Sequence, residues 1–126
     1  MSELILRLPY PPSVNHYWKT RSIKLGNKYT RIVYISSKGI EFRRSVANVV
    51  IVNRVKGFGG SLLRMEVKLY PPDRRRRDVD NVLKALFDSL QHAGVYNDDS
   101  QIKQLYIEML EKREGGEVEI TLRAIE

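Results

Sequence analysis

Alternating apolar and polar positions predict most of the strands in this chain. The stretch LILRL, residues 4–8, places leucines at every second position, and the prolines of PYPPS end it at once. Residues 17–35 have the pattern of a β-hairpin that turns at Gly26-Asn27. SLLRMEVKLY, residues 61–70, alternates most regularly and predicts a half-buried strand that Pro71-Pro72 terminates.

Helical periodicity covers two longer stretches. The first begins at Ser36 or Ser37, either of which can cap a helix, and ends near Gly57; its apolar face is formed by Phe42, Val46, Val49 and Val50. The second runs from about Asp78 to Ala93, with Gly94 as its stop. Its predicted buried stripe consists of Val79, Leu83, Leu86 and Leu90.

The C-terminal part predicts a further hairpin. Strands at about 103–112 and 117–125 flank Gly115-Gly116, a pair suited to a turn. No linker, repeat or low-complexity segment divides the chain. We therefore expect one small α+β domain over residues 1–126, in which a mixed, mostly antiparallel sheet carries two helices packed on one face.

Composition narrows the possible chemistry. The chain has 126 residues, enough to bury a core, and it contains no cysteine. Thiol nucleophiles, thiolate metal sites and disulfides are thereby excluded. No apolar run approaches the roughly 18 residues that span a bilayer, and the first residues lack the pattern of a signal peptide. These features favour a soluble, cytoplasmic protein with no membrane partner and no small-molecule cofactor.

The charge distribution points to an anionic partner. The formal net charge is +7, and a basic surface of this kind favours nucleic acid. One dense cluster of arginines occupies residues 74–77, and a second, looser group comprises Lys19, Arg21, Lys24, Lys28 and Arg31. Guanidinium groups match phosphate oxygens in pairs, so the dense cluster predicts salt-sensitive binding to a polyanion.

The stretch PPDRRRRDVDN, residues 71–81, sets this cluster beside carboxylates and allows two interpretations. In the first, Asp73 and Asp78 neutralise the arginines, while Asp78 or Asp80 caps the following helix for about 1 kcal/mol. Lys84, four residues after Asp80, then forms an exposed pair with it. In the second, the arginines bind a polyanion and the aspartates bind a metal ion that generates the attacking hydroxide. Lys84 then positions the phosphate.

The metal hypothesis requires a third acid. Asp99, in the loop NDDS, follows the second helix and meets Asp78 and Asp80 only if the chain returns toward the start of that helix. Carboxylates about 4 Å apart repel by roughly 4 kcal/mol at an effective dielectric constant of 20, and a divalent cation removes this penalty. Mg²⁺ suits such a site because it takes one or two carboxylates, keeps several waters and shares phosphate oxygens.

The segment PPSVNHYWK, residues 11–19, adds groups that suit nucleic acid. Asn15 and His16 can contact a phosphate or a base edge, and Tyr17 and Trp18 can stack on an unpaired base. Core packing is the structural alternative for at least one of the two aromatic residues.

Three blocks of this sequence resemble one known family. LPYPPSVNHYW, PPDRRRRDVDNVLKALFDSL and AGVYNDDSQI occur in the order found in the RusA-type Holliday-junction resolvases, the crossover junction endodeoxyribonucleases of bacteria and their prophages. The central pattern R-D-x-D-N-x-x-K, followed by a D-D-S-Q loop, is far more specific than two neighbouring aspartates. The resemblance covers nearly the whole chain.

The resemblance implies a homodimeric, Mg²⁺-dependent endonuclease, with Mn²⁺ as a substitute, that nicks two opposed strands of four-way junction DNA during recombination and repair. It places the metal-binding aspartates at Asp78, Asp80 and Asp99 and the catalytic lysine at Lys84. It places the DNA contacts at Ser13, Val14, Asn15, His16, Arg74, Arg75, Arg76, Arg77 and Asn81. His16 departs from the family pattern, in which arginine often occupies this position, and a histidine is mostly neutral at pH 7.

Two alternatives remain from the residues themselves. A non-catalytic nucleic-acid-binding protein explains the arginines and the aromatic residues equally well, with the aspartates acting only as helix caps. A metal nuclease that acts on other branched or single-stranded DNA is the third possibility. Dependence on Mg²⁺ separates the binder from the enzymes.

Overall fold

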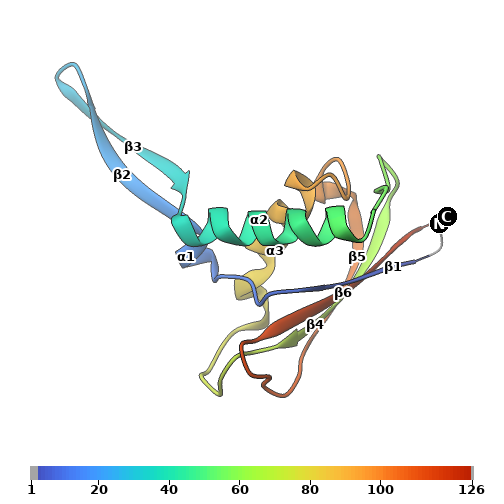
Figure 1. Cartoon of the computed structure of the whole chain (residues 1–126). Coiled ribbons are helices and arrows are strands. Elements are labelled where there is room, and N and C mark those ends of the chain that lie inside the picture. Colours follow the sequence, from blue (N-terminus) through green and yellow to red (C-terminus); the bar gives the residue numbers. More distant parts are fainter. Residues whose placement is uncertain (1–2, 126) are drawn as a thin grey trace.

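The computed structural model describes residues 3–125, which form a four-stranded sheet, a separate two-stranded ribbon and two main helices (Figure 1). In chain order the elements are β1 (Leu4–Leu8), α1 (Val14–Tyr17), β2 (Trp18–Leu25), β3 (Lys28–Ile35), α2 (Ser37–Val52), β4 (Leu63–Tyr70), η1 (Val79–Val82), α3 (Leu83–His92), η2 (Asp99–Gln101), β5 (Ile102–Met109) and β6 (Glu117–Ala124), where η denotes a short 3₁₀ helix.

The four-stranded sheet has the order β1-β6-β4-β5. β6 is antiparallel to both of its neighbours, and β5 is parallel to β4. One face of the sheet is apolar, because every second side chain of β1, β4 and β6 is buried; these are Leu6, Leu8, Leu63, Met65, Val67, Leu69, Val118, Ile120 and Leu122. The predicted α+β class, with a mixed and mostly antiparallel sheet, is confirmed.

The predicted C-terminal hairpin is wrong. β5 and β6 follow each other in the chain but do not pair, because β4 lies between them. β4 buries Leu63, Met65, Val67, Leu69 and Tyr70, and its interior place in the sheet lets it bond to a neighbour on both sides. The glycines at 115 and 116 therefore connect two strands that are separated by a third.

The helices cover the apolar face of the sheet, as predicted. α2 packs against α3 and against β1 (Figure 1). Its cap is the predicted Ser36, whose Oγ accepts a hydrogen bond from Gly39 N at 3.0 Å. The second helix differs from the prediction, because its first turn is the 3₁₀ helix η1. This change of geometry shifts the buried stripe: Val79 is 41% exposed, whereas Leu86 and Leu90 are buried.

The predicted hairpin with its turn at Gly26-Asn27 is confirmed, and it forms a sheet of its own. β2 and β3 pair from Trp18 opposite Ile35 to Leu25 opposite Lys28. They make no strand pairing with the four-stranded sheet and project from the body of the molecule (Figure 1).

The base of the ribbon is fixed by close packing against α2. Tyr17 is completely buried, and Ser36 N donates to Tyr17 O at 2.9 Å. Gly39 lies against the same carbonyl, since a Cβ added there would be 2.8 Å from Tyr17 O and 2.6 Å from Ile35 Cγ1. Only glycine therefore fits at this position of α2.

Replacing Gly39 with alanine tests this close approach. Alanine in a helix normally gains about 1 kcal/mol over glycine, but the clash with a backbone oxygen should reverse the sign. We expect Gly39→Ala to lower the free energy of unfolding by about 1–3 kcal/mol, measured by chemical denaturation. Gly60→Ala is the control, because the atom nearest to its added Cβ is 3.7 Å away. Equal stability of Gly39→Ala and the wild type would contradict the packing described for the ribbon base.

Candidate active site and nucleic-acid surface

Two segments that are far apart in the sequence leave the sheet at the same end. β1 and β4 are both antiparallel to β6, so they run in the same direction. Leu8 and Leu69 both pair with Val118, so the two strands also end at the same level. The proline-rich segment after β1 and the arginine loop after β4, residues 71–78, therefore emerge side by side.

These two segments line one cleft of about 470 Å³. Ser13 and His16 belong to the first segment, and Arg75–Asp78 and Asn81 belong to the second. Lys38, from the first turn of α2, completes the lining. The structure thus brings together members of both segments predicted to contact DNA, together with one of the candidate metal ligands.

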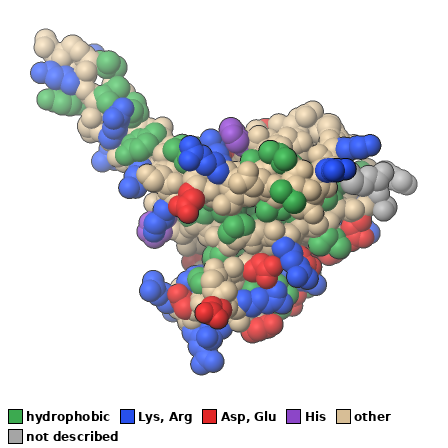
Figure 2. All heavy atoms as spheres, in the orientation of Figure 1, with side chains coloured by type: hydrophobic (Ala, Val, Ile, Leu, Met, Phe, Trp, Pro, Cys, Tyr) green, Lys and Arg blue, Asp and Glu red, His purple; other side chains and the backbone are tan. Residues whose placement is uncertain are grey.

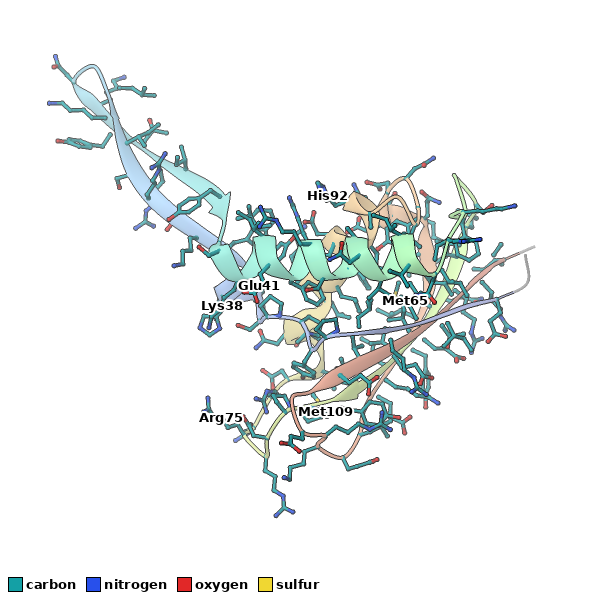
Figure 3. All side chains as sticks on the ribbon, in the orientation of Figure 1. Lys38, Glu41, Met65, Arg75, His92 and Met109 are labelled. Carbon is teal, nitrogen blue, oxygen red and sulfur yellow. The ribbon has the colours of Figure 1, made fainter. Side chains whose placement is uncertain are left out.

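The charged residues that line the cleft are mostly basic. Lys38 and Arg75 project on the same side of the molecule, the first from α2 and the second from the arginine loop (Figure 3). Asp78 is the one acidic residue in the described lining. On the lower part of the face shown in Figure 2, basic side chains lie among acidic ones. The local potential therefore favours an anion.

The arginine loop is shaped by an internal ion pair. Arg77 Nη1 donates to Asp73 Oδ1 at 2.7 Å and to two backbone carbonyl oxygens of the loop. This hydrogen bond, followed by one from Arg75 N, lowers the pKa of Asp73 to about 2. Arg77 is thus held by the protein itself. The side chains of Arg74 and Arg76 make no hydrogen bond or ion pair among residues 3–125, and Arg75 reaches Asp73 only at 3.7 Å.

The acids near the site fall into two groups. Asp73, Asp88 and Asp98 each accept hydrogen bonds from protein groups. The carboxylates of Asp78, Asp80 and Asp99 accept none and form no ion pair within the described part of the chain. The three acids proposed from the sequence as metal ligands are the three whose oxygens have no protein partner.

This distinction weakens the interpretation that Asp78 and Asp80 serve only to cap the helix and to pair with Lys84. Asp78 does occupy the N-cap position of η1, but its side chain makes no capping hydrogen bond. Lys84 does not pair with Asp80 in residues 3–125; its charge instead lowers the pKa of Asp88, as the weakest of several causes. Neither the cap nor the exposed pair expected from the sequence is formed.

Asp99 lies on a rigid loop away from the other two acids. Gln101 anchors this loop by donating to Gly59 O at 2.9 Å and Ser61 O at 2.7 Å, and Asp98 caps η2. β5 runs beside β4, but Ile102 pairs with Leu63 at the beginning of β4, whereas the arginine loop follows its end. The start of β5 therefore does not carry Asp99 to the arginine loop.

The position of Asp99 relative to α3 follows from Gln91, in the last turn of this helix: Asp99 N donates to Gln91 Oε1 at 3.0 Å. Beside this loop, the hydroxyl of Tyr96 donates to Phe87 O at 2.7 Å. Burial raises the pKa of Tyr96 well above its usual range, and the charges of Asp99 and Asp88 raise it further. Asp80 precedes Gln91 by about 17 Å of helix. Among residues 3–125, no three histidine or acidic side chains form a group that could hold a metal ion.

One polar cluster beside the site was missed by the sequence analysis. Asp88 is half-buried; Arg43 Nη2 donates to it at 2.5 Å, and the hydroxyl of Tyr17 also donates to it. Arg43 Nε donates to the Tyr17 hydroxyl at 2.9 Å. This cluster joins α1, α2 and α3, so it fixes the wall of the cleft that carries Ser13 and His16.

Two further residues were also missed. Lys38 gave no signal beyond its charge, and its place in the cleft depends on how α2 begins. Tyr10 has a buried hydroxyl with no hydrogen-bond partner in the described residues, and it lies in the cleft lining. Burial is the largest cause that raises the pKa of Tyr10, so the hydroxyl stays protonated and can donate.

The helices give no indication of a membrane segment. None of the helices in residues 3–125 is long and apolar enough to cross a bilayer.

Comparison with known proteins gives a consistent result. The profile of the family described as Endodeoxyribonuclease RusA matches residues 9–123. A crossover junction endodeoxyribonuclease rusA of Enterobacteria phage HK97 is 40% identical over 126 residues, which is 100% of this chain and 98% of that protein. The crossover junction endodeoxyribonuclease RusA of Escherichia coli K12 is 32% identical over 123 residues, 97% of this chain and 95% of the relative. One solved structure, the OmpA-like domain of FopA1 from Francisella tularensis, has a TM-score of 0.29 and 10% identity over 94% of this chain and 91% of that chain, which is too low to support an argument.

Removing the carboxylate of Asp88 tests the polar cluster. Burial alone would raise the pKa of Asp88, but the hydrogen bonds from Tyr17 and Arg43 outweigh it and the pKa is lowered. The stabilisation is therefore complete above the unfolded pKa of about 3.9 and is lost as the pH falls through the lower folded value. We expect Asp88→Asn to cost about 1–3 kcal/mol at pH 7, with a difference from the wild type that shrinks below pH 4.

Denaturation curves from pH 3 to pH 7 measure this difference. Asp98→Asn is the matched control, because asparagine also caps a helix and the change should cost less than about 0.5 kcal/mol. A difference for Asp88→Asn that stays constant across this pH range would show that the cluster is not ionic.

Proposed function

The chain belongs to the RusA endodeoxyribonuclease family, and we propose on this premise that it hydrolyses phosphodiester bonds in four-way junction DNA. The observation that carries the proposal is the cleft in which basic side chains surround a carboxylate without a protein partner. The family supplies the reaction class, and the cleft supplies a place where a DNA backbone would meet that carboxylate.

The basic side chains of the cleft would bind and orient the DNA backbone. Arg75 and Arg76 of the cleft lining, and Arg74 beside them in the loop, are the proposed phosphate contacts; Arg77 also lines the cleft and is a further proposed contact, although its Nη1 is bound to Asp73. Lys38 adds a charge from the opposite element, and Asn81 adds hydrogen-bond donors. The contacts expected at Ser13, Val14, Asn15 and His16 remain proposals; all four lie in or just before α1, at the base of the ribbon.

A Mg²⁺ ion fits the donors that these residues offer. Carboxylate oxygens are its preferred ligands, and one or two suffice when water and substrate phosphate complete the shell. Asp78 and Asp80 would hold the ion, since both are exposed and neither is used by another protein group. When bound, such an ion activates a water molecule and offsets charge that develops on the phosphate. Mn²⁺ is a proposed substitute.

Asp99 and Lys84 complete the proposed set of reactive side chains. We assign Asp99 as the third carboxylate because its carboxylate oxygens, too, have no protein partner, although it lies in η2, near the far end of α3. Gln101 holds the loop of Asp99 in place. For all three carboxylates to bind one ion, the start of η1 would therefore have to move toward Asp99. Lys84, exposed on the first turn of α3, would hold the scissile phosphate or the leaving oxygen.

Paired nicking follows from the symmetry of the substrate. A four-way junction presents symmetry-related strands, so a homodimer would give each of two opposed strands its own cleft. We propose that the protein acts as such a dimer in the cytoplasm, in DNA recombination and repair, and that residues 1–126 function as one domain.

A non-catalytic DNA-binding role is the second candidate. The absence of a three-acid group among residues 3–125 favours it, since binding needs only the basic cleft. The two proposals differ in their response to metal: a pure binder gains no activity from Mg²⁺, whereas the enzyme needs it.

The substitution Asp80→Asn tests the enzyme. It keeps the shape of the side chain and removes one metal-binding charge, so Mg²⁺-dependent cleavage of a synthetic four-way junction should fall by at least about 100-fold. Binding to the same junction, measured by gel shift in Ca²⁺, should remain within about threefold of the wild type. Glu108→Gln, which removes an exposed acid of β5 outside the cleft lining, is the control for a general change of charge. Cleavage by Asp80→Asn at the wild-type rate would remove this residue from the mechanism.

The substitution Arg76→Ala tests the phosphate contacts. Binding should weaken, and the slope of log Kobs against log salt concentration should fall by about one unit for the lost contact. Arg123→Ala, an exposed arginine on β6 outside the cleft lining, should leave the slope unchanged. An unaltered slope for Arg76→Ala would show that the Arg76 side chain is solvated and contacts no phosphate in the complex.

A further inference from the structure

The β2–β3 ribbon is attached to the body only at its base, and most of its length projects into solvent. Its two eight-residue strands pair along their whole length, yet their side chains are almost all exposed. An isolated two-stranded hairpin is marginally stable in water. Figure 1 shows the ribbon extending away from the helices and the sheet. A long free ribbon of this kind indicates a partner that covers it.

The charge of the ribbon identifies the kind of partner. Residues 18–35 contain five basic side chains and no acid; the basic residues are Lys19, Arg21, Lys24, Lys28 and Arg31. Directly opposite residues share one face of an antiparallel pair, so the register puts Lys24 and Arg31 on one face and Lys19, Arg21 and Lys28 on the other. Neither face is covered by another element of residues 3–125, so cations are available on both sides.

Exposed apolar groups lie between these cations. Tyr29 is 73% exposed and Val33 is 65% exposed. The Lys24 ammonium lies 6.0 Å from the centre of the Tyr29 ring, and the Arg21 guanidinium lies 5.7 Å from that of Tyr34. The space-filling view shows basic and apolar side chains alternating along the ribbon (Figure 2). Such a surface matches a nucleic-acid groove, where phosphates border sugar and base edges.

The place where the ribbon is attached links it to the cleft. β2 begins immediately after α1, whose His16 lines the cleft, and the base is fixed through Tyr17 and Ser36. Eight extended residues span about 25 Å, which equals about seven base pairs of duplex at roughly 3.4 Å each. The ribbon therefore begins at the cleft and reaches well beyond it.

We propose that the β2–β3 ribbon is a DNA-binding arm that lies in a groove of the duplex arm adjoining the cleavage site. The major groove of B-DNA admits a two-stranded β-ribbon, and cations on both faces would meet phosphates on both walls. This inference rests on the proposed function, because it takes the duplex in the cleft as its starting point.

A second copy of the chain is the competing partner. Its acids cluster near the C-terminus, but Arg113 pairs with Glu117 and Arg7 lies 3.6 Å from Glu119, so part of that charge is already compensated. Two ribbons that met across a symmetry axis would bring ten cations together. A polyanion that neutralises both faces at once is the better match.

Two ribbon variants test the proposal. Lys24→Gln, Lys28→Gln and Arg31→Gln together remove three charges from the outer part of the ribbon. The matched control removes three exposed charges elsewhere, by Lys56→Gln, Lys68→Gln and Arg123→Gln. A shortened variant replaces residues 21–32 with Asn-Gly and keeps the cross-strand pairs at 18–20 and 33–35. Circular dichroism and thermal melts show whether each variant folds.

The measurement is the salt dependence of binding to four-way junctions with arms of 25 base pairs and of 5 base pairs. On long arms the slope of log Kobs against log salt should fall by about two to three units in both ribbon variants, and it should stay at the wild-type value in the control. On short arms the ribbon variants should match the wild type, because no duplex lies beneath the ribbon. The wild-type hydroxyl-radical footprint should extend about five base pairs farther than that of the shortened variant, because the variant loses five residues, or about 17 Å, of ribbon length.

Three results overturn the proposal, and they are distinguishable. Wild-type slopes for both ribbon variants on long arms, with normal junction cleavage, would reject the arm alone and leave the proposed function intact. An unchanged slope together with a shift from dimer to monomer in sedimentation would assign the ribbon to contact between copies. Failure of the wild type to bind or cut any junction in Mg²⁺ would reject the function and the arm together.

Discussion

The cleft exists because two strands of the sheet run in the same direction. β1 and β4 are separated by β6 and are both antiparallel to it, and Leu8 and Leu69 meet it at the same residue, Val118. A proline-rich segment from the beginning of the chain therefore emerges beside an arginine loop from its middle. The backbone hydrogen bonds of the sheet and the burial of its apolar face enforce this arrangement. The proposed chemistry depends on that register, since a displaced β1 would leave the arginines without the opposing wall of α1 and α2.

The aspartates around the cleft and along α3 differ in whether their carboxylates bind other protein groups. Asp73 shapes the arginine loop, Asp88 joins three helices, and Asp98 caps the loop that carries Asp99. Each of these carboxylates accepts hydrogen bonds from the protein, and Asp73 and Asp88 also form ion pairs, so all three contribute to the fold. Asp78, Asp80 and Asp99 remain available to a ligand. Because the partnered acids hold the elements on which the free acids stand, the fold supports negative charges that have no compensation within the protein.

Local patterns in the sequence predicted local features well. The alternation of residues 61–70, the turn at Gly26-Asn27 and the cap at Ser36 are all confirmed, because each depends on neighbouring residues. The sheet order was missed, since no local signal shows that β4 separates β5 from β6. The contacts of Asp88 were missed because its partners, Arg43 and Tyr17, are distant in the chain. The ribbon was predicted as a hairpin, but its projection from the body could not be, because alternation does not reveal whether a second layer covers a strand. The site residues stay a prediction, supported by the family and by the missing protein partners of three acids.

The most direct test of this account compares two neighbouring acids of one loop. Asp98 and Asp99 are adjacent, but Asp98 is used as a cap and Asp99 has free oxygens. The measurement is the rate at which Asp99→Asn and Asp98→Asn cleave a synthetic four-way junction with Mg²⁺ and without it. We expect Asp99→Asn to lose Mg²⁺-dependent cleavage, whereas Asp98→Asn retains it, because asparagine preserves the cap. Full activity of Asp99→Asn would contradict the central claim that the carboxylates without partners form the site of reaction.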